Sequence, residues 1–387
     1  MTARVKPSAR LIDDDPWVRV NRSHSRTKIR IVDLFAGIGG FHYGIGAAAA
    51  EFGHAVDPVL VSEIDESCRS TYEINHRCDS EGDIRRISLS DYRNQTADIL
   101  TAGFPCQPFS NSGKKLGLRD PRGRFYDKIE ELILHFEAKA FILENVPGMT
   151  TNGGASHDSL LAVRPQKIGR TMHLLERKLI ALHDYNVRWI EVDSSKLGSP
   201  QVRKRVYIVG LRKDLAEGLD LRFREFVPKP FMSVVSNDPH VELGLSSRQE
   251  GNVRSFMGDP PKFREGMRCV GKAYRCEGGN VGQAYHAHGM VPTLTKVWAR
   301  FLPIYFPHPK EKALPSLKDR TFEPDFSYYG KGPIRRASVE EVMLLQGFPK
   351  SFRPHENPAR AYEHAGNAVN AKVVREIARI LLDYVQP

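Results

Sequence analysis

The segment from residue 29 to residue 63 constrains the fold more than any other part of this chain. It reads as an apolar strand, IRIVDLF, a glycine turn, AGIGG, a helix-like run, and a second apolar strand that ends at Glu63. Helix-like segments recur at about 66–75, 127–138 and 168–184, and each precedes a short apolar stretch. Strands that alternate with helices predict an α/β fold with a doubly wound, mostly parallel sheet.

Composition changes along the chain and predicts four segments. Residues 1–28 are polar and charged without strand or helix periodicity, so we expect a loosely ordered basic arm. Residues 29–212 carry the alternating pattern and predict a Rossmann-like catalytic and cofactor-binding sheet. Residues 213–333 are rich in Pro, Gly, Arg and aromatic residues, and they predict a second, smaller, irregular β-rich domain. Residues 334–387 end in an amphipathic helix pattern that is expected to pack back on the catalytic domain.

Length and charge exclude several classes of protein. With 387 residues and 41% hydrophobic content, the chain is long enough for two domains and too apolar for a disordered protein. No apolar run approaches the ~20 residues of a membrane span and no signal core is present, so we expect a cytoplasmic protein. The net charge of +11 favours a polyanionic partner, which charge alone leaves open as DNA or RNA.

The cysteines argue against metal and disulfide frameworks. The five cysteines form no CxxC pair, which is not the pattern of a zinc ribbon or a disulfide-rich domain. His286 and His288 lie near Cys276, but their spacing fits no zinc pattern, so we expect no metal site.

The glycine turn predicts a nucleotide-like ligand. Glycines between a strand and a helix let the backbone approach a ligand, as in Phe35-Ala36-Gly37-Ile38-Gly39. Glu63 ends the next strand, where its carboxylate can accept hydrogen bonds from two ribose hydroxyls. Gly82-Asp83-Ile84 is expected to end another strand, where Asp83 can accept from an adenine amino group. These features indicate an adenosine-containing cofactor and leave a nicotinamide dehydrogenase open.

A thiol, a carboxylate and guanidinium groups follow three other apolar strands. Cys106 comes after Gly103-Phe104-Pro105, Glu144 lies in Glu144-Asn145-Val146, and Arg203 and Arg205 lie in Gln201-Val202-Arg203-Lys204-Arg205. Because α/β enzymes present reactive groups at strand ends, these side chains can converge on one pocket. The set suits nucleophilic attack of a thiolate on a polarised heterocycle.

The blocks DLFAGIGGF, Pro-Cys, ENV, QxRxR and Gly366-Asn367-Ala368-Val369, in this order, closely resemble those of the DNA cytosine-5 methyltransferases of bacterial restriction–modification type. The resemblance covers almost all residues from Ile29 onward. It implies S-adenosyl-L-methionine as cofactor, bound by these residues: Phe35, Ala36, Gly37, Gly39, Glu63, Ile64, Asp83, Ile84, Pro105, Asn367 and Val369. It also implies Cys106 as nucleophile, Glu144 as proton donor to the base, Arg205 on its carbonyl oxygen and Arg203 as orienting group.

The resemblance further implies double-stranded DNA as substrate, with the cytosine rotated out of the stack. The segment after Cys106 predicts a loop that closes over DNA through Ser110, Ser112, Lys114, Lys115, Arg119, Arg122 and Arg124. Gln283, in Gly282-Gln283, is expected to fill the space left by the cytosine, and Thr293, in HGMVPTLT, to contact the DNA backbone. Residues 213–333 are therefore expected to recognise the target sequence.

We expect a monomeric enzyme that modifies DNA alongside a cognate restriction endonuclease. Two alternatives remain open at this point. A tRNA-methylating relative would be expected to lack the segment between Leu211 and Ile334, and a catalytically dead DNA-binding regulator would be expected to have lost Cys106 or Glu144.

Overall fold

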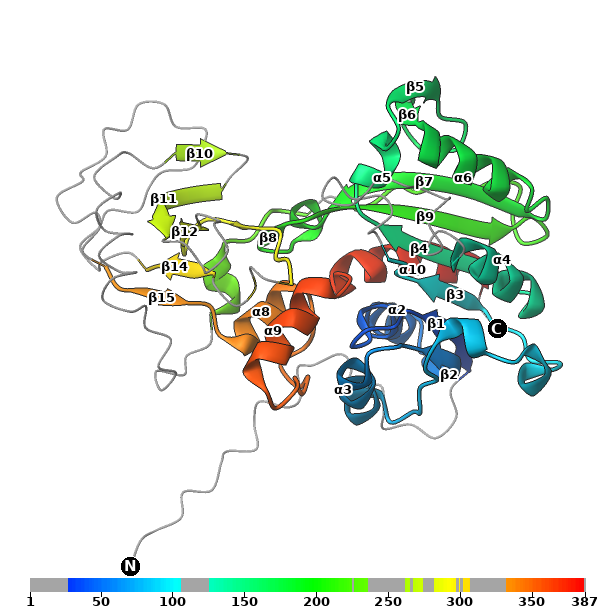
Figure 1. Ribbon diagram of the computed structural model, residues 1–387, viewed down its shortest axis with the longest axis horizontal. Helices are drawn as coiled ribbons and strands as arrows, with labels where there is room; N and C mark the ends of the chain where they lie inside the picture. The colour runs from blue at the N-terminus through cyan, green and yellow to red at the C-terminus, as the bar shows by residue number, and fades with distance from the viewer. Residues whose placement is uncertain are drawn as a thin grey trace, which may run out of the picture. The chain divides into compact units, whose positions relative to one another are not determined.

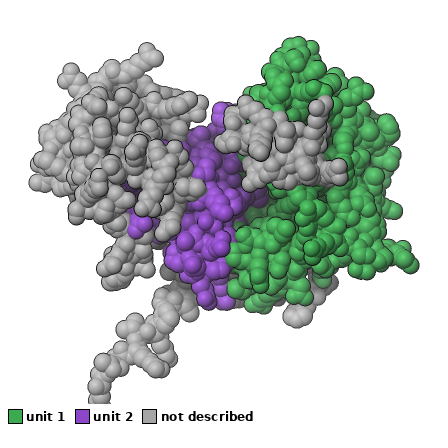
Figure 2. Space-filling model, viewed as in Figure 1, with its two compact units in different colours: residues 1–191, 206–223, 373–387 green, residues 192–205, 224–372 purple. Residues whose placement is uncertain are grey.

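The computed structural model describes residues 27–105, 125–224, 226–235, 262–264, 267–273, 282–296, 299, 302–306 and 332–385. The chain divides into two compact units, which Figure 2 shows in different colours. Unit 1 comprises residues 1–191, 206–223 and 373–387, and unit 2 comprises residues 192–205 and 224–372. The boundaries of these two units differ from those of the four functional segments expected from the sequence. The functional boundaries stay a prediction.

Unit 1 is built on a six-stranded sheet in the order β2-β1-β3-β4-β9-β7 (Figure 1). The strands are β1 (Lys28–Leu34), β2 (Ala55–Ser62), β3 (Ile99–Ala102), β4 (Ala140–Asn145), β7 (Tyr185–Asp193) and β9 (Lys204–Arg212). β1 pairs in parallel with β2 and β3, β3 pairs in parallel with β4, and β9 runs antiparallel to β4. The carboxyl ends of β2, β1, β3 and β4 therefore meet at one edge of the sheet.

Helices and short elements connect these strands. The helices of this part of the chain are α2 (Gly40–Glu51), α3 (Glu66–His76), α4 (Phe125–His135), α5 (Gly148–Thr151), α6 (Arg170–Ile180) and α10 (Ala371–Val385). The 3₁₀ turns are η1 (Ile84–Arg86), η2 (Leu89–Tyr92) and η5 (Ser194–Leu197), and β5 (Ala155–Asp158) pairs with β6 (Lys167–Gly169). Every residue of β3 is buried, which is typical of a parallel strand covered on both faces.

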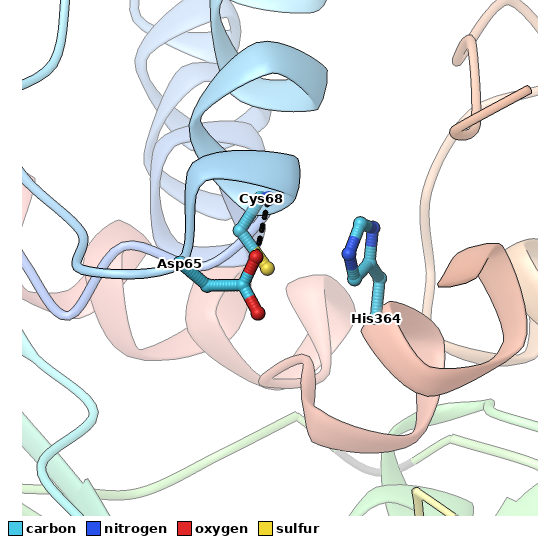
Figure 3. Close-up of side chains that lie close together, drawn as sticks. All are labelled: Asp65, Cys68 and His364. Carbon is cyan, nitrogen blue, oxygen red and sulfur yellow. Dashed lines mark hydrogen bonds between the residues drawn. The ribbon is translucent and has the colours of Figure 1, made fainter.

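Local sequence explains where these helices begin. The Asp65 carboxylate accepts a hydrogen bond from the backbone N–H of Ser67 at 2.9 Å and so caps α3. It also accepts one from the Cys68 N–H at 3.3 Å, which Figure 3 shows. In α6, Met172, Leu175 and Leu179 recur at helical spacing and are buried. The helix therefore packs its apolar stripe into the core of unit 1, around Trp189 and Phe141.

Unit 2 contains a five-stranded mixed sheet in the order β10-β11-β12-β14-β15. Its strands are β10 (Lys262–Arg264), β11 (Met267–Ala273), β12 (Gly282–His286), β14 (Pro303–Tyr305) and β15 (Ile334–Arg336). A second pair joins β8 (Gln201–Val202) to β13 (Val291–Pro292) in parallel. The helical elements are η6 (Phe231–Val234), α8 (Val339–Leu345) and α9 (Pro358–Asn367).

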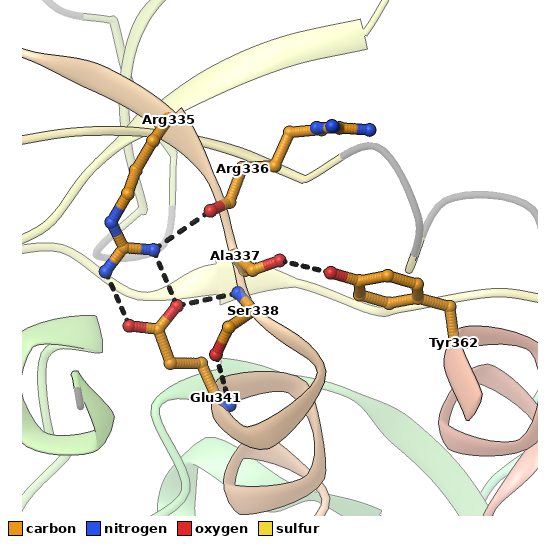
Figure 4. A network of polar contacts seen from close by, with 6 residues as sticks. All are labelled: Arg335, Arg336, Ala337, Ser338, Glu341 and Tyr362. Carbon is orange, nitrogen blue, oxygen red and sulfur yellow. Dashed lines mark hydrogen bonds and ion pairs between the residues drawn. The ribbon is translucent and has the colours of Figure 1, made fainter. Parts of the chain in front are cut away.

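A capping box begins α8, as Figure 4 shows. Ser338 Oγ accepts from the Glu341 N–H at 3.1 Å, while Glu341 Oε2 accepts from the Ser338 N–H at 2.8 Å. Arg335 adds a two-pronged ion pair to the same carboxylate, at 2.8 Å and 2.6 Å. The Tyr362 hydroxyl of α9 donates to the Ala337 carbonyl at 2.8 Å, so α8, α9 and β15 form one packed group.

The expected fold class is confirmed, since helices connect a mostly parallel sheet and a smaller β-rich sheet follows. The expected strand ending at Gly82-Asp83-Ile84 is wrong. Glu81 forms only an isolated bridge with Ser62, and Ile84 begins the 3₁₀ turn η1, because the Asp83 side chain caps that turn by accepting from the Arg85 N–H. No helix in the described ranges is long and apolar enough to cross a membrane.

Candidate active site

The glycine turn between β1 and α2 has an unusual backbone. Gly37 and Gly39 have φ of 56° and 91°, in the left-handed region where a side chain is strained. Phe35 also has a positive φ, 53°, although it carries a side chain. Its ring contacts Phe125 edge to face, with ring centroids 5.3 Å apart. A strained aromatic residue at a strand-to-helix turn is typical of a ligand-binding position.

Glu63 holds this turn in place. Its Oε2 accepts a hydrogen bond from the Gly37 N–H at 2.9 Å, and its Oε1 accepts from the Asp65 N–H at 2.8 Å. The Ala36 N–H also donates to the Ser62 carbonyl at 3.0 Å. Because a carboxylate offers about four acceptor positions, Glu63 retains capacity for the hydroxyls of a ligand. The structure thus brings Gly37 and Glu63 together, as the sequence predicts.

A pocket of about 560 Å³ has Ile64, the neighbour of Glu63 in the chain, in its wall. It is lined by Ile64, Arg69, Glu81, Gly82, Asp83, Arg85, Arg86 and Ile87. The Ile64 side chain is 66% exposed, which is unusual for a large apolar residue and suits contact with a flat apolar ligand. Ile84, in contrast, is 3% exposed and belongs to the core. It does not line the pocket, although Asp83 and Arg85 on either side of it do.

Asp83 faces the pocket with its charge already partnered. Arg85 Nε donates to both Asp83 oxygens, at 2.9 Å and 3.0 Å, and these hydrogen bonds lower the pKa of Asp83 below its usual value. The carboxylate is therefore ionised at neutral pH and is an acceptor for an amino group of a ligand. Arg85 also lies 5.7 Å from the Phe125 ring centroid. An adenosine-containing cofactor fits the pocket, the exposed Ile64 side chain and the carboxylates of Glu63 and Asp83.

The strand-end turn after β3 lies against Glu144. A methyl group placed on Gly103 would lie 3.9 Å from Glu144 Oε2 and 3.6 Å from the Phe41 ring, which are ordinary van der Waals distances. Asn145, which is 1% exposed, donates from Nδ2 to the Phe104 carbonyl at 3.2 Å. The end of β4 therefore fixes the chain that leads through the half-buried Pro105 toward Cys106.

Arg203 is buried, and its guanidinium donates to backbone carbonyls of unit 2. Nη1 donates to the Leu294 carbonyl at 2.9 Å and to the Gly366 carbonyl at 3.4 Å, and Nη2 donates to the Ala368 carbonyl at 2.8 Å. Arg203 is only 2% exposed. The guanidinium therefore joins the segments that contain Thr293 and Asn367, and the orienting role expected for Arg203 stays a prediction. Arg205 Nη1 donates to the Lys204 carbonyl at 2.7 Å.

Several expected site residues lie in unit 2. Thr293 Oγ1 donates to the Val202 carbonyl at 2.9 Å, so this hydroxyl holds β13 against β8. Gln283 lies in β12, opposite Lys272 of β11. Asn367 is exposed at the end of α9, and Val369 is 9% exposed.

Other expected site residues lie outside the described ranges. They are Cys106, Ser110, Ser112, Lys114, Lys115, Arg119, Arg122 and Arg124. Their roles stay predictions.

Sequence reasoning missed side chains that the structure places in the site. Arg69 and Arg85 line the pocket, Phe125 packs on Phe35, and Asn145 braces the turn before Cys106. Only Asn145 had a direct signal, because it is the second residue of Glu144-Asn145-Val146. The others depend on which strand ends become neighbours.

Known proteins are similar to this chain over nearly its whole length. A family profile described as C-5 cytosine-specific DNA methylase matches residues 29–383. The Type II methyltransferase M.HgiCI of Herpetosiphon aurantiacus is 41% identical, over 90% of this chain and 96% of the relative. M.BanI of Aneurinibacillus aneurinilyticus is 29% identical, over 90% of this chain and 95% of the relative. The methyltransferase EhMeth of Entamoeba histolytica shares the fold, with a TM-score of 0.64, 14% identity, and coverage of 92% of this chain and 99% of that one.

Proposed function

The chain belongs to the C-5 cytosine-specific DNA methylase family, and from this premise we propose that it methylates carbon 5 of a flipped cytosine through a covalent adduct with Cys106. The resemblance to DNA (cytosine-5-)methyltransferases stated from the motifs is confirmed by the family match and by M.HgiCI. Enzymes of this family use S-adenosyl-L-methionine. The finer points of mechanism, target and partner are the proposal.

One observation carries the proposed mechanism. The Glu144 carboxylate lies beside Gly103, and the neighbouring Asn145 holds the Phe104 carbonyl, only two residues before Cys106. Carbon 5 of cytosine is too weak a nucleophile to accept a methyl group unaided, and addition of a thiolate to carbon 6 turns the ring into an enamine. A carboxyl group at the strand end that leads toward Cys106 supports this addition, because it can supply a proton to the ring nitrogen.

Each residue then has a defined task. The Cys106 thiolate forms a bond to carbon 6 while the ring electrons move toward carbon 5, and Glu144 hydrogen-bonds ring nitrogen 3 and the exocyclic amine. Arg205 binds the carbonyl oxygen. The methyl group passes from the sulfonium to carbon 5 and leaves a neutral thioether. Solvent water then takes the proton from carbon 5, and departure of the thiolate restores the aromatic ring.

The cofactor supplies an electrophilic methyl group on its sulfonium sulfur. Phe35, Glu63, Ile64 and Asp83 would hold its adenosine part, and the Gly37 to Gly39 turn would allow close approach of the backbone. The geometry of the pocket and of Glu63 supports this assignment. Ala36, Gly37, Ile84, Pro105, Asn367 and Val369 complete the proposed cofactor set.

DNA recognition is assigned to residues 213–333, with Gln283 in the space left by the cytosine. Ser110, Ser112, Lys114, Lys115, Arg119, Arg122 and Arg124 would meet the DNA in front of the pocket. The names of the Type II relatives support a modification enzyme. The proposal adds that it acts in the cytoplasm as a monomer, alongside a restriction endonuclease.

Trapping the adduct tests this function. DNA bearing 5-fluorocytosine should form a stable covalent complex with the wild type in the presence of cofactor, since fluorine blocks loss of the ring substituent. Cys106→Ser should abolish both the complex and methyl transfer. Cys78→Ser is a matched control, because burial raises the pKa of Cys78 to about 11 and leaves that thiol protonated. A normal rate of turnover by Cys106→Ser would exclude the mechanism, and methylation of tRNA in preference to DNA would exclude the substrate.

A further inference from the structure

A cluster of buried polar side chains lies under the glycine turn, and the reaction proposed above does not use it. Asp33, Tyr72 and Thr101 are fully buried, and His42 is 4% exposed. They come from β1, α3, β3 and α2 of unit 1. Polar groups are costly to bury, so a cluster of them in a sheet core calls for a physical role.

Hydrogen bonds join these groups into a chain. Thr101 Oγ1 donates to Asp33 Oδ1 at 2.8 Å, and the Tyr72 hydroxyl donates to Asp33 Oδ2 at 3.4 Å. His42 Nδ1 lies 2.8 Å from the same Tyr72 hydroxyl. Donors from β3 and α3 thus orient the two oxygens of the Asp33 carboxylate.

His76 connects this chain to the turn. Its ring stacks on His42 with centroids 3.9 Å apart, and a methyl group placed on Gly39 would lie 2.1 Å from His76 Nε2. The imidazole therefore fills the space directly against Gly39. Burial lowers the pKa of His42 to about 3 and the pKa of His76 well below its usual value, so both rings are neutral near pH 7.

The charge of Asp33 is poorly balanced. Within the described ranges it forms no ion pair, and burial, with the nearby Glu63 carboxylate adding to it, raises the pKa of Asp33 to about 7. The groups that interact with Asp33 are Thr101 of β3, Tyr72 of α3, Cys78 after α3 and Glu63 after β2. His42 and Tyr43 of α2 interact with Tyr72 in turn. None of these side chains is a cation at neutral pH.

A nearby cation would compensate this charge, and the two forms of the cofactor differ in charge. S-adenosyl-L-methionine has a sulfonium, an ammonium and a carboxylate, which makes it a net cation. Its product, S-adenosyl-L-homocysteine, has a neutral thioether sulfur and no net charge. We propose that Asp33 is a specificity-determining residue that favours the cationic cofactor over the spent product, held in position by Tyr72, His42 and His76 under the glycine turn. This inference rests on the proposed placement of the cofactor at that turn.

The proposal predicts a pH dependence with a definite sign. As pH falls through 7, a proton neutralises Asp33 and removes the attraction for the sulfonium, so affinity for S-adenosyl-L-methionine falls. Affinity for S-adenosyl-L-homocysteine changes much less over the same range. By linkage, binding of the cation must lower the pKa of Asp33, whereas binding of the neutral product leaves it nearly unchanged.

Calorimetric titration of the full-length protein with each ligand, at several pH values on both sides of 7, tests the proposal. In the wild type, the preference for the cofactor over the product should grow about fivefold or more from the acid to the alkaline side. Asp33→Asn has nearly the same shape without the charge, so it should remove this growth and hold the preference at its acid-side value. A wild-type preference independent of pH would overturn the proposal, as would an Asp33→Asn variant that keeps the wild-type profile.

Two further variants separate the possible failures. Glu63→Ala should weaken the binding of both ligands at every pH. If both affinities stay unchanged, the proposed placement of the cofactor is wrong. If only the pH dependence expected for Asp33 is not found, the placement stands and the role of Asp33 is wrong. Tyr72→Phe removes one hydroxyl from the chain and should shift the pH at which cofactor affinity falls. Tyr185→Phe is its matched control, because Tyr185 is also buried and donates to the Ala138 carbonyl at 2.6 Å, away from Asp33. An equal effect of the two Tyr→Phe changes would contradict a role for the Tyr72 hydroxyl.

Discussion

Each compact unit holds a glycine-containing segment close to a buried ionisable side chain, and the two side chains have opposite charge. In unit 1 the buried group is Asp33, which accepts hydrogen bonds from hydroxyl groups. In unit 2 it is Arg203, which donates to three backbone carbonyls around Gly366. A carboxylate can lose its charge by taking up a proton, whereas a guanidinium stays charged at any pH that a protein survives. The first site can therefore respond to pH, and the second acts as a permanent connection.

The largest expected effect is on unit 2. Arg203→Met keeps most of the side-chain volume but leaves the carbonyls of Leu294, Gly366 and Ala368 without their donor. The free energy of unfolding should fall by about 3–5 kcal/mol, independently of pH, since buried acceptors of charge-assisted hydrogen bonds lose their partner. Urea unfolding at two pH values measures this loss. Arg360→Met, at an exposed ion pair on α9, is the control and should change little; equal midpoints for the two variants would contradict the connecting role.

A smaller effect of opposite sign is expected in unit 1. Folding raises the pKa of Asp33 from 3.8 to about 7, so the carboxyl contributes stability that is complete at acid pH and is lost as pH rises through 7. Asp33→Asn stays neutral, and above pH 7 it should be more stable than the wild type by on the order of 2–4 kcal/mol. The gain should shrink toward acid pH.

Thermal or urea unfolding across the pH range checks this, with Asp98→Asn as the control. Asp98 has an ion pair to Lys139 at 2.8 Å and accepts from the Arg30 N–H at 2.7 Å, so its neutralisation should lower stability. If Asp33→Asn lowers stability above pH 7, the carboxylate is not an uncompensated charge and the contrast between the two units fails.

The smallest effect is expected from Gly→Ala substitutions at Gly39 and Gly366, which test whether a side chain or the backbone lies against each glycine. An alanine methyl at position 39 would meet the His76 side chain at 2.1 Å, whereas one at position 366 would meet the Thr295 backbone at 2.5 Å. Each Gly→Ala change should cost about 1–3 kcal/mol of unfolding free energy. His76→Ala should recover part of the loss for Gly39→Ala, with the φ of 91° limiting the recovery. Thr295→Ala should recover nothing for Gly366→Ala, because the obstruction is backbone; recovery there would show that the segment can move.

Local patterns predicted much of unit 1. The apolar run that became β1 and the glycine turn after it were both identified, because buried strands and tight turns need particular residue types close together in sequence. The cap of η1 by Asp83 was missed, since a short side chain that bonds its own backbone competes with strand formation. α9 was also missed, although Asn357 caps it and Pro358 begins it, because its polar composition gave no apolar period.

The sequence by itself determined the chemistry that is proposed for this protein. Each proposed function needs one residue type at one place in a motif, and such a motif can be recognised from the order of residues alone. This holds for the glycine turn, Glu63, Cys106 and Glu144. Only the tertiary structure decided the surroundings of those groups. Asp33 resembles any other strand residue in the sequence, and only the fold brings Tyr72 and Thr101 to it. In the same way, only the fold brings the carbonyls of Leu294 and Ala368 to Arg203. Charge and hydrogen-bonding capacity belong to a residue, whereas burial and partners are created when segments distant in the chain pack together.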